Sequence, residues 1–225
     1  MLPRVLEPEV MDTPEEARDY DDMDHSGVNR LFASDLIAAA QAKPEVLAGD
    51  WLDLGTGTAQ IPIEVCRQTP EGRILAVDAA IEMLELARYN LEIAGVTQRV
   101  RLAHVDAKTL PYANGQFDVV MSNSIVHHIP EPAGVLAEAV RVVKPGGLIF
   151  FRDLLRPDSD AEVERLVALY AAECNDHQRA LFEASLRAAL TLEEVTALVE
   201  PLGFAASSVQ ATSDRHWTWA GWKGE

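Results

Sequence analysis

The hydrophobic positions between residues 50 and 152 alternate between two periods. Short apolar runs are typical of buried strands, and apolar residues three or four positions apart are typical of helices. The runs predict strands over 51–54, 73–78, 99–106, 117–122 and 148–152, and the helical spacing predicts helices over 59–68, 80–94 and 131–143. Strands that alternate with helices form βαβ units, so five parallel strands are expected here.

The pattern changes on both sides of this region. Two N-terminal helices are expected, one beginning at Thr13-Pro14 and one over 28–42. A further helix begins at Thr191, and residues 205–210 and 216–222 predict an antiparallel pair. The expected fold is α/β, with a Rossmann-like, doubly wound, seven-stranded sheet that is mostly parallel and has an antiparallel last strand. A helical cap is expected at about 154–190, because two amphipathic stretches there lack any strand pattern.

Composition and charge narrow the class of protein. The 225 residues carry a formal charge of −17, and 48% of them are hydrophobic, which excludes disorder as the main state. A strongly acidic surface repels polyphosphate, so no nucleic acid is expected as a partner. The first thirty residues contain nine acidic and three basic side chains, and we interpret this run as a solvated helix face.

The location of the protein is inferred from missing signals. No apolar run approaches the roughly 18 residues of a membrane span, and the first residues lack the apolar core of a signal peptide. We therefore expect a cytoplasmic protein without a membrane partner. Cys66 and Cys174 belong to no CxxC spacing, so neither a disulfide scaffold nor a metal site is expected.

A glycine turn follows the first predicted strand. In Asp53-Leu54-Gly55-Thr56-Gly57-Thr58-Ala59, the two glycines allow a tight turn and close approach of a ligand to the main chain. A dinucleotide fingerprint would have a third glycine where Gln60 stands, and it would not place Asp53 before the turn. Both departures point away from a bound pyrophosphate.

Together with four later segments, this turn resembles the motifs of class I S-adenosylmethionine-dependent methyltransferases. Residues 53–59 are similar to the first motif, with Ala59 where a third glycine is frequent. The later segments are Ala76-Val77-Asp78, His104-Val105-Asp106-Ala107, Phe117 to Asn123, and Lys144-Pro145-Gly146-Gly147. Five motifs in the family's order cover residues 50 to about 152, and the resemblance implies S-adenosylmethionine as the cofactor.

The resemblance also implies how the carboxylates bind this cofactor. Asp78 would accept the two ribose hydroxyls, because an ionised carboxylate accepts hydrogen bonds only. Asp106 would accept the adenine amine, beside the main-chain amide of Ala107, and Asp53 would meet the ammonium group. The structural alternatives are a helix cap for Asp78, a turn cap for Asp106 and support of the glycine turn for Asp53.

Two apolar or aromatic side chains complete the expected cofactor site. Met83 would pack on the adenine or belong to the helix core, and Tyr20 would cover the cofactor or pack the N-terminal helix on the sheet. The full set of expected cofactor residues is Asp53, Gly55, Thr56, Gly57, Asp78, Ala79, Met83, Asp106, Ala107, Asn123 and Tyr20.

The methyl acceptor is expected beside Asn123 and under the cap. His127 and His128 are the candidate catalytic residues, either as a general base or as a pair that only shapes the loop. The candidate substrate residues are Arg152, Asp153, His177 and Arg187. Arginine suits a carboxylate or phosphate on the acceptor, and ion pairing within this acidic protein is the alternative. Because no segment resembles the base-methylating motifs of nucleic-acid enzymes, the resemblance implies a small-molecule acceptor.

The resemblance therefore implies an enzyme that transfers a methyl group from S-adenosylmethionine and releases S-adenosylhomocysteine. Another chemistry on the same cofactor (a lyase or a carboxy-S-adenosylmethionine type) and a non-catalytic cofactor-binding protein are the alternatives. Residues 1–45 would form a lid over the cofactor, and residues 46–225 the methyltransferase domain, whose cap helps to exclude water. The sequence leaves open whether O, N, C or S is methylated and whether the protein is a homodimer.

Overall fold

Seven strands form a mixed sheet in the order β3-β2-β1-β4-β5-β7-β6 in the computed structural model, which describes residues 2–7 and 13–224. The strands are β1 (Asp50–Leu54), β2 (Arg73–Asp78), β3 (Val100–His104), β4 (Phe117–Asn123), β5 (Val143–Leu154), β6 (Val209–Ala211) and β7 (His216–Trp222). The first five are parallel, and β7 is antiparallel to both β5 and β6. The expectation of a mostly parallel sheet with an antiparallel last strand is confirmed.

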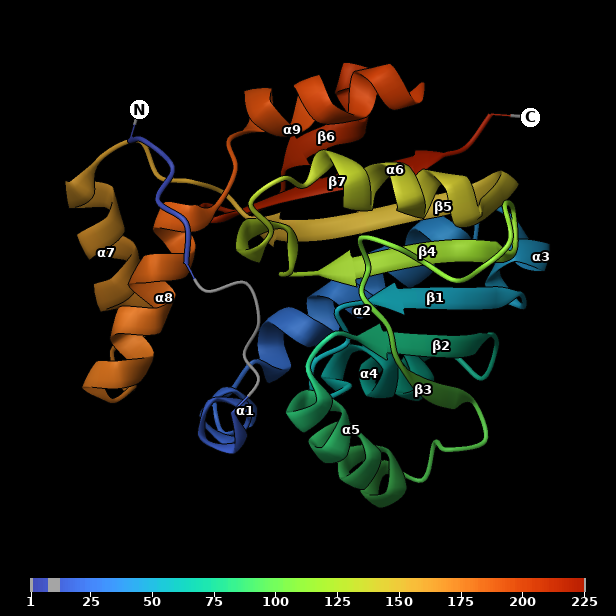
Figure 1. Ribbon diagram of the computed structural model, residues 1–225, viewed down its shortest axis with the longest axis horizontal. Coiled ribbons are helices and arrows are strands. Elements are labelled where there is room, and N and C mark those ends of the chain that lie inside the picture. Colours follow the sequence, from blue (N-terminus) through green and yellow to red (C-terminus); the bar gives the residue numbers. More distant parts are fainter. Residues whose placement is uncertain (1, 8–12, 225) are drawn as a thin grey trace.

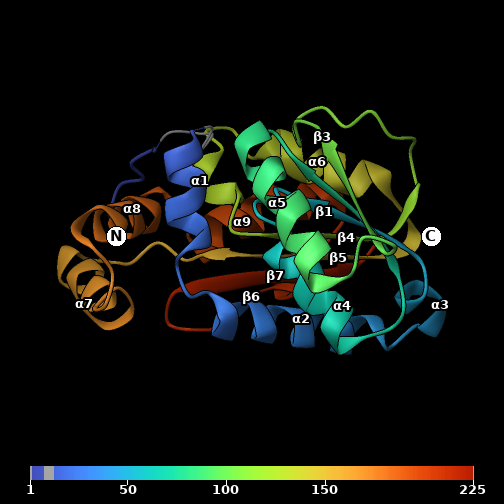
Figure 2. The same ribbon diagram turned by 90° about the horizontal axis from the view of Figure 1, so that it is seen from below.

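Helices cover both faces of this sheet (Figure 1 and Figure 2). One face carries α2 (Ser26–Ala40), α4 (Gln60–Gln68) and α5 (Ile81–Ala94), and the other carries α6 (Ala133–Val142) and α9 (Leu192–Val199). The remaining elements are α1 (Pro14–Asp21), α3 (Pro44–Leu47), α7 (Asp160–Tyr170), α8 (Asp176–Ala188), and the short 3-10 turns η1 (Val126–His128), η2 (Glu200–Leu202) and η3 (Ala206–Ser208). Within the described part of the chain, no helix has the length and hydropathy needed to cross a membrane.

The two-sided cover explains the runs of consecutive apolar residues in the central strands, such as Val119-Val120-Met121 of β4. Val119 and Met121 of β4 pack into the core under α2 and α4, together with Phe32 of α2. Val120, between them in sequence, packs into the opposite core with Leu136 of α6. Successive side chains of a strand alternate between faces, so a strand buried on both sides needs an unbroken apolar run.

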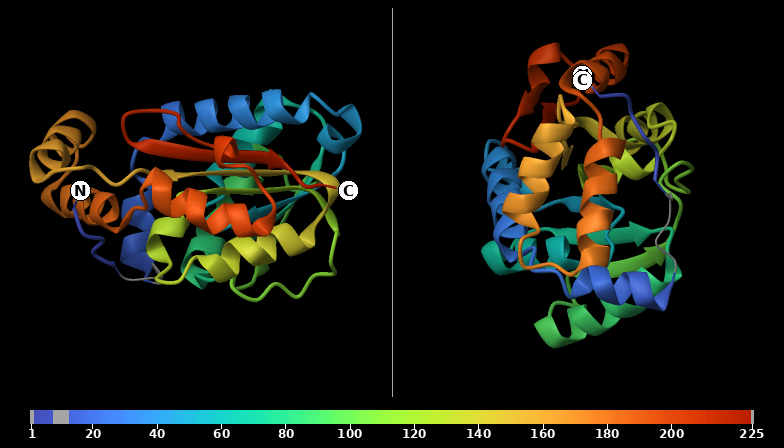
Figure 3. Two further views of the ribbon diagram at one scale, coloured as in Figure 1. Left: turned by 90° about the horizontal axis from the view of Figure 1, so that it is seen from above. Right: turned by 90° about the vertical axis from the view of Figure 1, so that its left-hand side faces the viewer.

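The carboxyl ends of the parallel strands point toward α1, α7 and α8 (Figure 1). Helices α7 and α8 lie side by side across these ends (Figure 3) and pack through Val163, Leu166 and Leu186. Leu2 of the N-terminal segment packs against the same cluster. The helical cap predicted at about 154–190 is therefore present, and it covers the sheet edge at which the motifs end.

Apart from shifts of a few residues at other ends, three elements differ from the sequence predictions. β5 begins at Val143 rather than Leu148, because the segment with Gly146 (φ +72°) still pairs through a register shift in β4. The strand expected over 205–210 is reduced to β6, because Ser208 donates from its N–H and its hydroxyl to the Ala205 carbonyl and closes η3. Helix α3 was not expected, and it begins at Pro44 in the first helical position.

Candidate active site

The glycine turn lies at the carboxyl end of β1. Gly55 and Gly57 have φ values of +69° and +55°, in the left-handed region that favours glycine. A Cβ atom on Gly55 would overlap the Ile125 side chain, so a larger residue would have to displace Ile125. Ala59 also has a positive φ (64°), which explains why the resembling motif prefers glycine at this position.

Asp78, at the end of β2, is hydrogen-bonded to this turn. Its Oδ2 accepts from Gly57 N at 2.8 Å and its Oδ1 from Ala80 N at 2.8 Å. Burial raises the pKa of Asp78, although these main-chain donors oppose the rise. The carboxylate therefore supports the turn and still has lone pairs for a ligand.

Asp53, at the end of β1, is 1% exposed, and its Oδ2 is buried without a hydrogen-bond partner among the described residues. Burial raises the pKa of Asp53 to about 7, and the nearby charge of Asp78 also raises it. A buried carboxyl group of this kind is suited to a positively charged ligand group, which would favour its ionised form.

The pocket formed where β1, β2, β3 and β4 end is here called the carboxyl-end pocket, and its volume is about 150 Å³. Nine of the eleven expected cofactor residues line it: Gly55, Gly57, Asp78, Ala79, Met83, Asp106, Ala107, Asn123 and Tyr20. The structure thus brings the predicted residues from five separate segments of the chain to one pocket.

The other two expected cofactor residues, Asp53 and Thr56, line an adjoining pocket of about 180 Å³, here called the glycine-turn pocket. Tyr20 and Asn123 line both pockets. Tyr20 also packs against Met83 and Ala80, so it both packs α1 onto the site and borders the pockets. Burial raises the pKa of Tyr20 to about 12, which keeps its hydroxyl neutral.

A third and larger pocket, of about 320 Å³, lies under α7 and α8 and is here called the cap pocket. Tyr20 and Asn123 line this pocket as well, so they stand at the junction of all three. Its walls include the apolar or aromatic residues Leu31, Leu181, Phe182 and Tyr170.

The charge of the cap pocket is opposite to that of the whole chain. Among the described residues that line it, Asp24 is the one carboxylate, against Arg152 and Arg215 and four histidines. Arg152 pairs with Asp35 at 2.7 Å, and Arg215 lies 3.6 Å from Asp214; neither acidic partner lines the pocket. Burial lowers the pKa of His216 to about 4, and the charges of Arg215 and Arg152 add to this shift.

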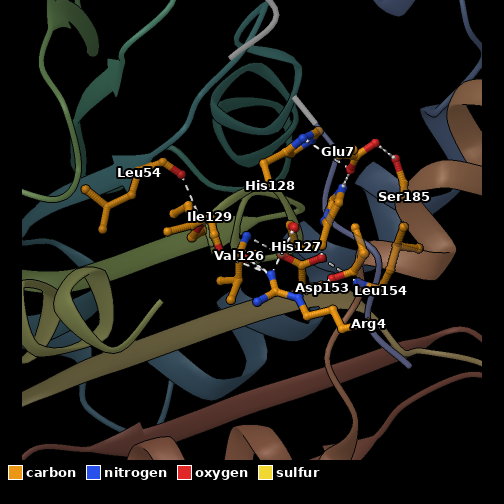
Figure 4. A network of polar contacts seen from close by, with 12 residues as sticks. Arg4, Glu7, Leu54, Val126, His127, His128, Ile129, Asp153, Leu154 and Ser185 are labelled. Carbon is orange, nitrogen blue, oxygen red and sulfur yellow. Dashed lines mark hydrogen bonds and ion pairs between the residues drawn. The ribbon is translucent and has the colours of Figure 1, made fainter. Parts of the chain in front are cut away.

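The predicted catalytic histidines lie in η1 and form a buried polar network (Figure 4). His127 Nδ1 is 2.5 Å from Asp153 Oδ1, and His127 Nε2 is 3.4 Å from Glu7 Oε1. His128 Nδ1 lies 3.2 Å from the same Glu7 oxygen. Burial alone would lower the pKa of His127, but the charge and hydrogen bond of Asp153 outweigh it and the pKa is raised.

The N-terminal segment is held onto η1 and α8 by Arg4. Its guanidinium donates to main-chain carbonyls of both elements: Ala188 at 2.7 Å, Ile129 at 2.9 Å, His127 at 3.1 Å and Pro130 at 3.1 Å. Val5 N donates to Arg187 O at 3.0 Å. This segment therefore lies beside the site, although it precedes the methyltransferase-like motifs by more than forty residues.

The structure places the four predicted substrate residues differently. Arg152 lines the cap pocket, whereas Asp153 is buried behind His127. Arg187 pairs with Asp160 at 2.8 Å and with Glu183 at 3.0 Å, and His177 is a largely exposed neighbour of Asp19. Neither Arg187 nor His177 is among the described residues that line the three pockets, and Arg187 forms the ion pairs expected as the alternative, so a substrate contact by either residue stays a prediction.

Four residues at the site were absent from the predicted set: Arg4, Glu7, Arg215 and His216. The interpretation of the N-terminal acidic run as a solvated face is wrong for Glu7, whose side chain is 4% exposed. Its neighbours give no helical or strand period that would mark it as buried. Arg215 lies in the turn between β6 and β7 and His216 begins β7, where their polar character is typical of any hairpin.

Comparison with known proteins agrees with this geometry. Residues 52–151 match a methyltransferase domain model. Relatives include a demethylmenaquinone methyltransferase of Lactobacillus johnsonii, 32% identical over 117 residues that make up 51% of this chain and 48% of that protein. The 27-O-demethylrifamycin SV methyltransferase of Amycolatopsis mediterranei is 32% identical over 118 residues, 52% of this chain and 43% of that protein.

Solved structures share the fold over nearly the whole chain. A protein of Methanococcus maripaludis, assigned as an S-adenosylmethionine-dependent methyltransferase, has a TM-score of 0.72 and 18% identity over 98% of each chain. The plantazolicin methyltransferase BpumL, solved with a desmethylPZN analogue and S-adenosylhomocysteine, has a TM-score of 0.69 and 14% identity over 94% of this chain and 92% of that one.

The matched region contains the glycine turn, Asp78, Asp106 and Asn123, so the family match and the carboxyl-end pocket coincide. Residues 52–151 therefore match a methyltransferase domain, and the relatives and the shared fold support the class I S-adenosylmethionine-dependent methyltransferases, the family that the motifs resemble. The chain spans about half the length of the curated relatives it matches.

Proposed function

We propose that the protein transfers a methyl group from S-adenosylmethionine to a small-molecule acceptor that carries a negatively charged group, and that it releases S-adenosylhomocysteine. The main support for this proposal is the carboxyl-end pocket, where a glycine turn and separated carboxylates suit the ribose and the adenine of the cofactor, with Asp53 nearby for its ammonium group. The methyltransferase names of the relatives and the S-adenosylhomocysteine bound to a structural neighbour support the same cofactor.

The carboxylates are assigned by the hydrogen bonds that each has left to accept. Each oxygen of Asp78 already takes one main-chain N–H and keeps a lone pair for a ribose hydroxyl. Asp106 Oδ1 accepts from Lys108 N at 2.8 Å, and the carboxylate retains room for the adenine amine, with Ala107 beside it. Met83, 5% exposed and lining the pocket, would contact the adenine face.

Asp53 is assigned to the ammonium group. Its buried, unpartnered oxygen lies in the glycine-turn pocket, which Gly55 joins to the carboxyl-end pocket. A cation there would pair with the carboxylate and offset the cost of burying its charge. Thr56 lines the same pocket, so the amino-acid end of the cofactor would lie along the turn.

The acceptor would bind in the cap pocket. Its two arginines favour a carboxylate or phosphate, because a guanidinium can bond two oxygens of such a group at once. The apolar residues of α8, Leu181 and Phe182, would hold a hydrocarbon or aromatic body. The pocket thus suits an amphipathic acid better than a cation or a nucleic acid.

Catalysis in this scheme depends chiefly on orientation. When bound, S-adenosylmethionine supplies a methyl group to a nucleophile in line with the breaking carbon–sulfur bond. Tyr20 and Asn123 line all three pockets and would align the two substrates and exclude water. His127 and His128 line the cap pocket and remain the proposed catalytic pair, with Asp153 as a positioning residue that orients His127.

Residues 1–45 and the cap would together close over the substrates. Arg4 already joins the N-terminal segment to η1 and α8, and Gln178 of α8 donates to the carbonyl of Asp19 in α1 at 3.3 Å. These contacts support a lid built from both parts. A cytoplasmic location and a homodimer stay predictions from the sequence.

The test is an incubation of the purified protein with methyl-labelled S-adenosylmethionine and fractionated small molecules from a cell extract. We expect S-adenosylhomocysteine together with a labelled acidic compound, in equal amounts. Methylthioadenosine or a modified sulfonium without a labelled acceptor would contradict the proposal and favour another reaction of the cofactor. Tight cofactor binding without any turnover would favour a non-catalytic role.

A further inference from the structure

Three metal-binding side chains meet where the N-terminal segment crosses η1 (Figure 4). They are Glu7, His127 and His128, and one ligand atom from each lies within 4.8 Å of the others. His127 Nε2 and His128 Nδ1 both face Glu7 Oε1, at 3.4 Å and 3.2 Å. Two imidazole nitrogens and one carboxylate oxygen therefore surround a common space.

The spacing of these atoms matches the ligands of a metal ion better than it matches hydrogen bonds. A charge-assisted hydrogen bond has a length of about 2.7–2.9 Å, and Glu7 Oε1 is buried and accepts no hydrogen bond from any described residue. A tetrahedral ion with metal–ligand distances of about 2.0–2.2 Å separates neighbouring ligand atoms by about 3.3–3.5 Å. Both observed separations lie in or close to that range.

The surrounding contacts orient the three ligands. Asp153 holds Nδ1 of His127 at 2.5 Å, so that Nε2 points toward Glu7. Ser185 donates to Oε2 of Glu7 at 3.1 Å, which directs Oε1 toward the histidines. A carboxylate behind a ligating histidine is a common feature of zinc sites, because it fixes the tautomer and the ring orientation.

We propose that Glu7, His127 and His128 bind a divalent first-row transition metal of the zinc type. Imidazole and carboxylate ligands suit such an ion, and Glu7 with Asp153 supplies two negative charges to balance it. The ion would join the N-terminal segment to η1. Because both histidines also line the cap pocket, its fourth coordination position would be open to water or to an acceptor atom.

Cysteine spacing gave no sign of this site, because its ligands are one N-terminal glutamate and two adjacent histidines far along the chain. The proposal does not depend on methyl transfer, and with the ion bound both histidines would act as its ligands and not as a general base. It is tested by metal binding alone, so the two proposals can fail separately.

The experiment uses the full chain after treatment with a chelator. Calorimetric titration with Zn²⁺ should give one equivalent per chain, and X-ray absorption should give zinc–nitrogen distances of about 2.0–2.1 Å. Titration with Co²⁺ should give the intense visible absorption of a four- or five-coordinate ion. Glu7→Gln and His128→Asn should each weaken binding at least about tenfold, since even the loss of an outer-shell partner costs that much. His177→Asn, in an exposed histidine, should leave binding unchanged.

Absence of stoichiometric binding, or binding that survives both Glu7→Gln and His128→Asn, would overturn the proposal and leave the cluster as an ion pair only. Thermal unfolding of each variant checks that it is folded. Glu7 lies in a terminal segment outside the sheet, so Glu7→Gln decides the question if His128→Asn does not fold.

Discussion

The buried carboxyl group of Asp53 suits a bound cation, but its ionised form lowers the stability of the folded protein without ligand. Its carboxyl group is 1% exposed, and burial raises its pKa from 3.8 to about 7. In the unfolded chain the group ionises near its ordinary pKa, whereas in the native protein it resists ionisation until about pH 7. Asp53 therefore favours the folded state below about pH 4, and this contribution is lost as the pH rises through about 7.

The first prediction follows from this shift. Asp53→Asn should make the protein without cofactor more stable at about pH 8, by about 2–4 kcal/mol, because the buried charge is removed. The difference should disappear at about pH 4, where the native carboxyl group is already neutral. Thermal or denaturant unfolding at both pH values measures it.

The same substitution should weaken S-adenosylhomocysteine binding by about 10- to 100-fold, through loss of a charge-assisted contact to the ammonium group. Asp22→Asn, in an exposed carboxylate directly after α1, is the control and should change neither quantity. A variant that is stabilised but binds normally would show that Asp53 only supports the turn.

At the residue scale, the sequence predicted side chains whose role depends on local chain geometry. Asp53, Asp78 and Asp106 each lie at or just beyond the carboxyl end of a strand, and parallel strands bring these ends to one edge. Glu7 escaped prediction because its environment depends on segments more than a hundred residues away, at η1 and α8.

The N-terminal segment acts as an element without regular secondary structure. Its attachment rests on Arg4, which donates to the carbonyls of His127 in η1 and Ala188 in α8. Arg4→Gln should lower the free energy of unfolding by about 1–3 kcal/mol, because hydrogen bonds from a charged donor are lost and carbonyls are left unpaired. Amide exchange should accelerate in η1 and at the end of α8.

Arg67→Gln provides the matched control for this prediction. The Arg67 side chain is 63% exposed and pairs with Glu64 one turn earlier in α4, so its loss should change stability by less than about 0.5 kcal/mol. Equal effects of the two substitutions would show that the segment is not held by Arg4.

Closure of the lid is a separate prediction at this scale. Addition of S-adenosylhomocysteine should slow amide exchange in α1, α7 and α8 together, because the proposed lid excludes water from the bound cofactor. Amides that are equally protected with and without ligand would identify the cap as a fixed packing element.

Strands could be predicted from the sequence where helices cover both faces of the sheet, because burial on both sides determines which residues are apolar. β2 coincides with the predicted residues 73–78, because it is a central strand between two parallel neighbours. β6 is an edge strand, and a local hydrogen bond of Ser208 was enough to shorten it. The path of residues 2–7 could not be predicted, since it follows from side-chain contacts rather than from periodicity.

At the scale of the whole molecule, the notable feature is a basic pocket inside an acidic protein. The chain carries a charge of −17, yet Arg152 and Arg215 line the cap pocket beside a single carboxylate among its described lining residues. With S-adenosylhomocysteine bound, fragments bearing a carboxylate should bind more tightly than their matched amides and amines, as measured by ligand-observed NMR. Arg215→Gln should remove at least about 1 kcal/mol of this preference. Amines that bind as tightly as the acids, or no binding by any acid, would contradict an anionic acceptor.

The central claim is that the carboxyl-end pocket binds the cofactor through Asp78, and titration calorimetry with S-adenosylhomocysteine tests it most directly. We expect one site per chain with micromolar-scale affinity, weakened in Asp78→Ala by about 1.5–3 kcal/mol, which corresponds to about 10- to 150-fold. Because Asp78 also supports the glycine turn, both proteins are first shown to be folded by thermal unfolding. Folded wild-type protein that gives no heat and no thermal stabilisation with this ligand, or an Asp78→Ala variant that binds as tightly as the wild type, would contradict the account.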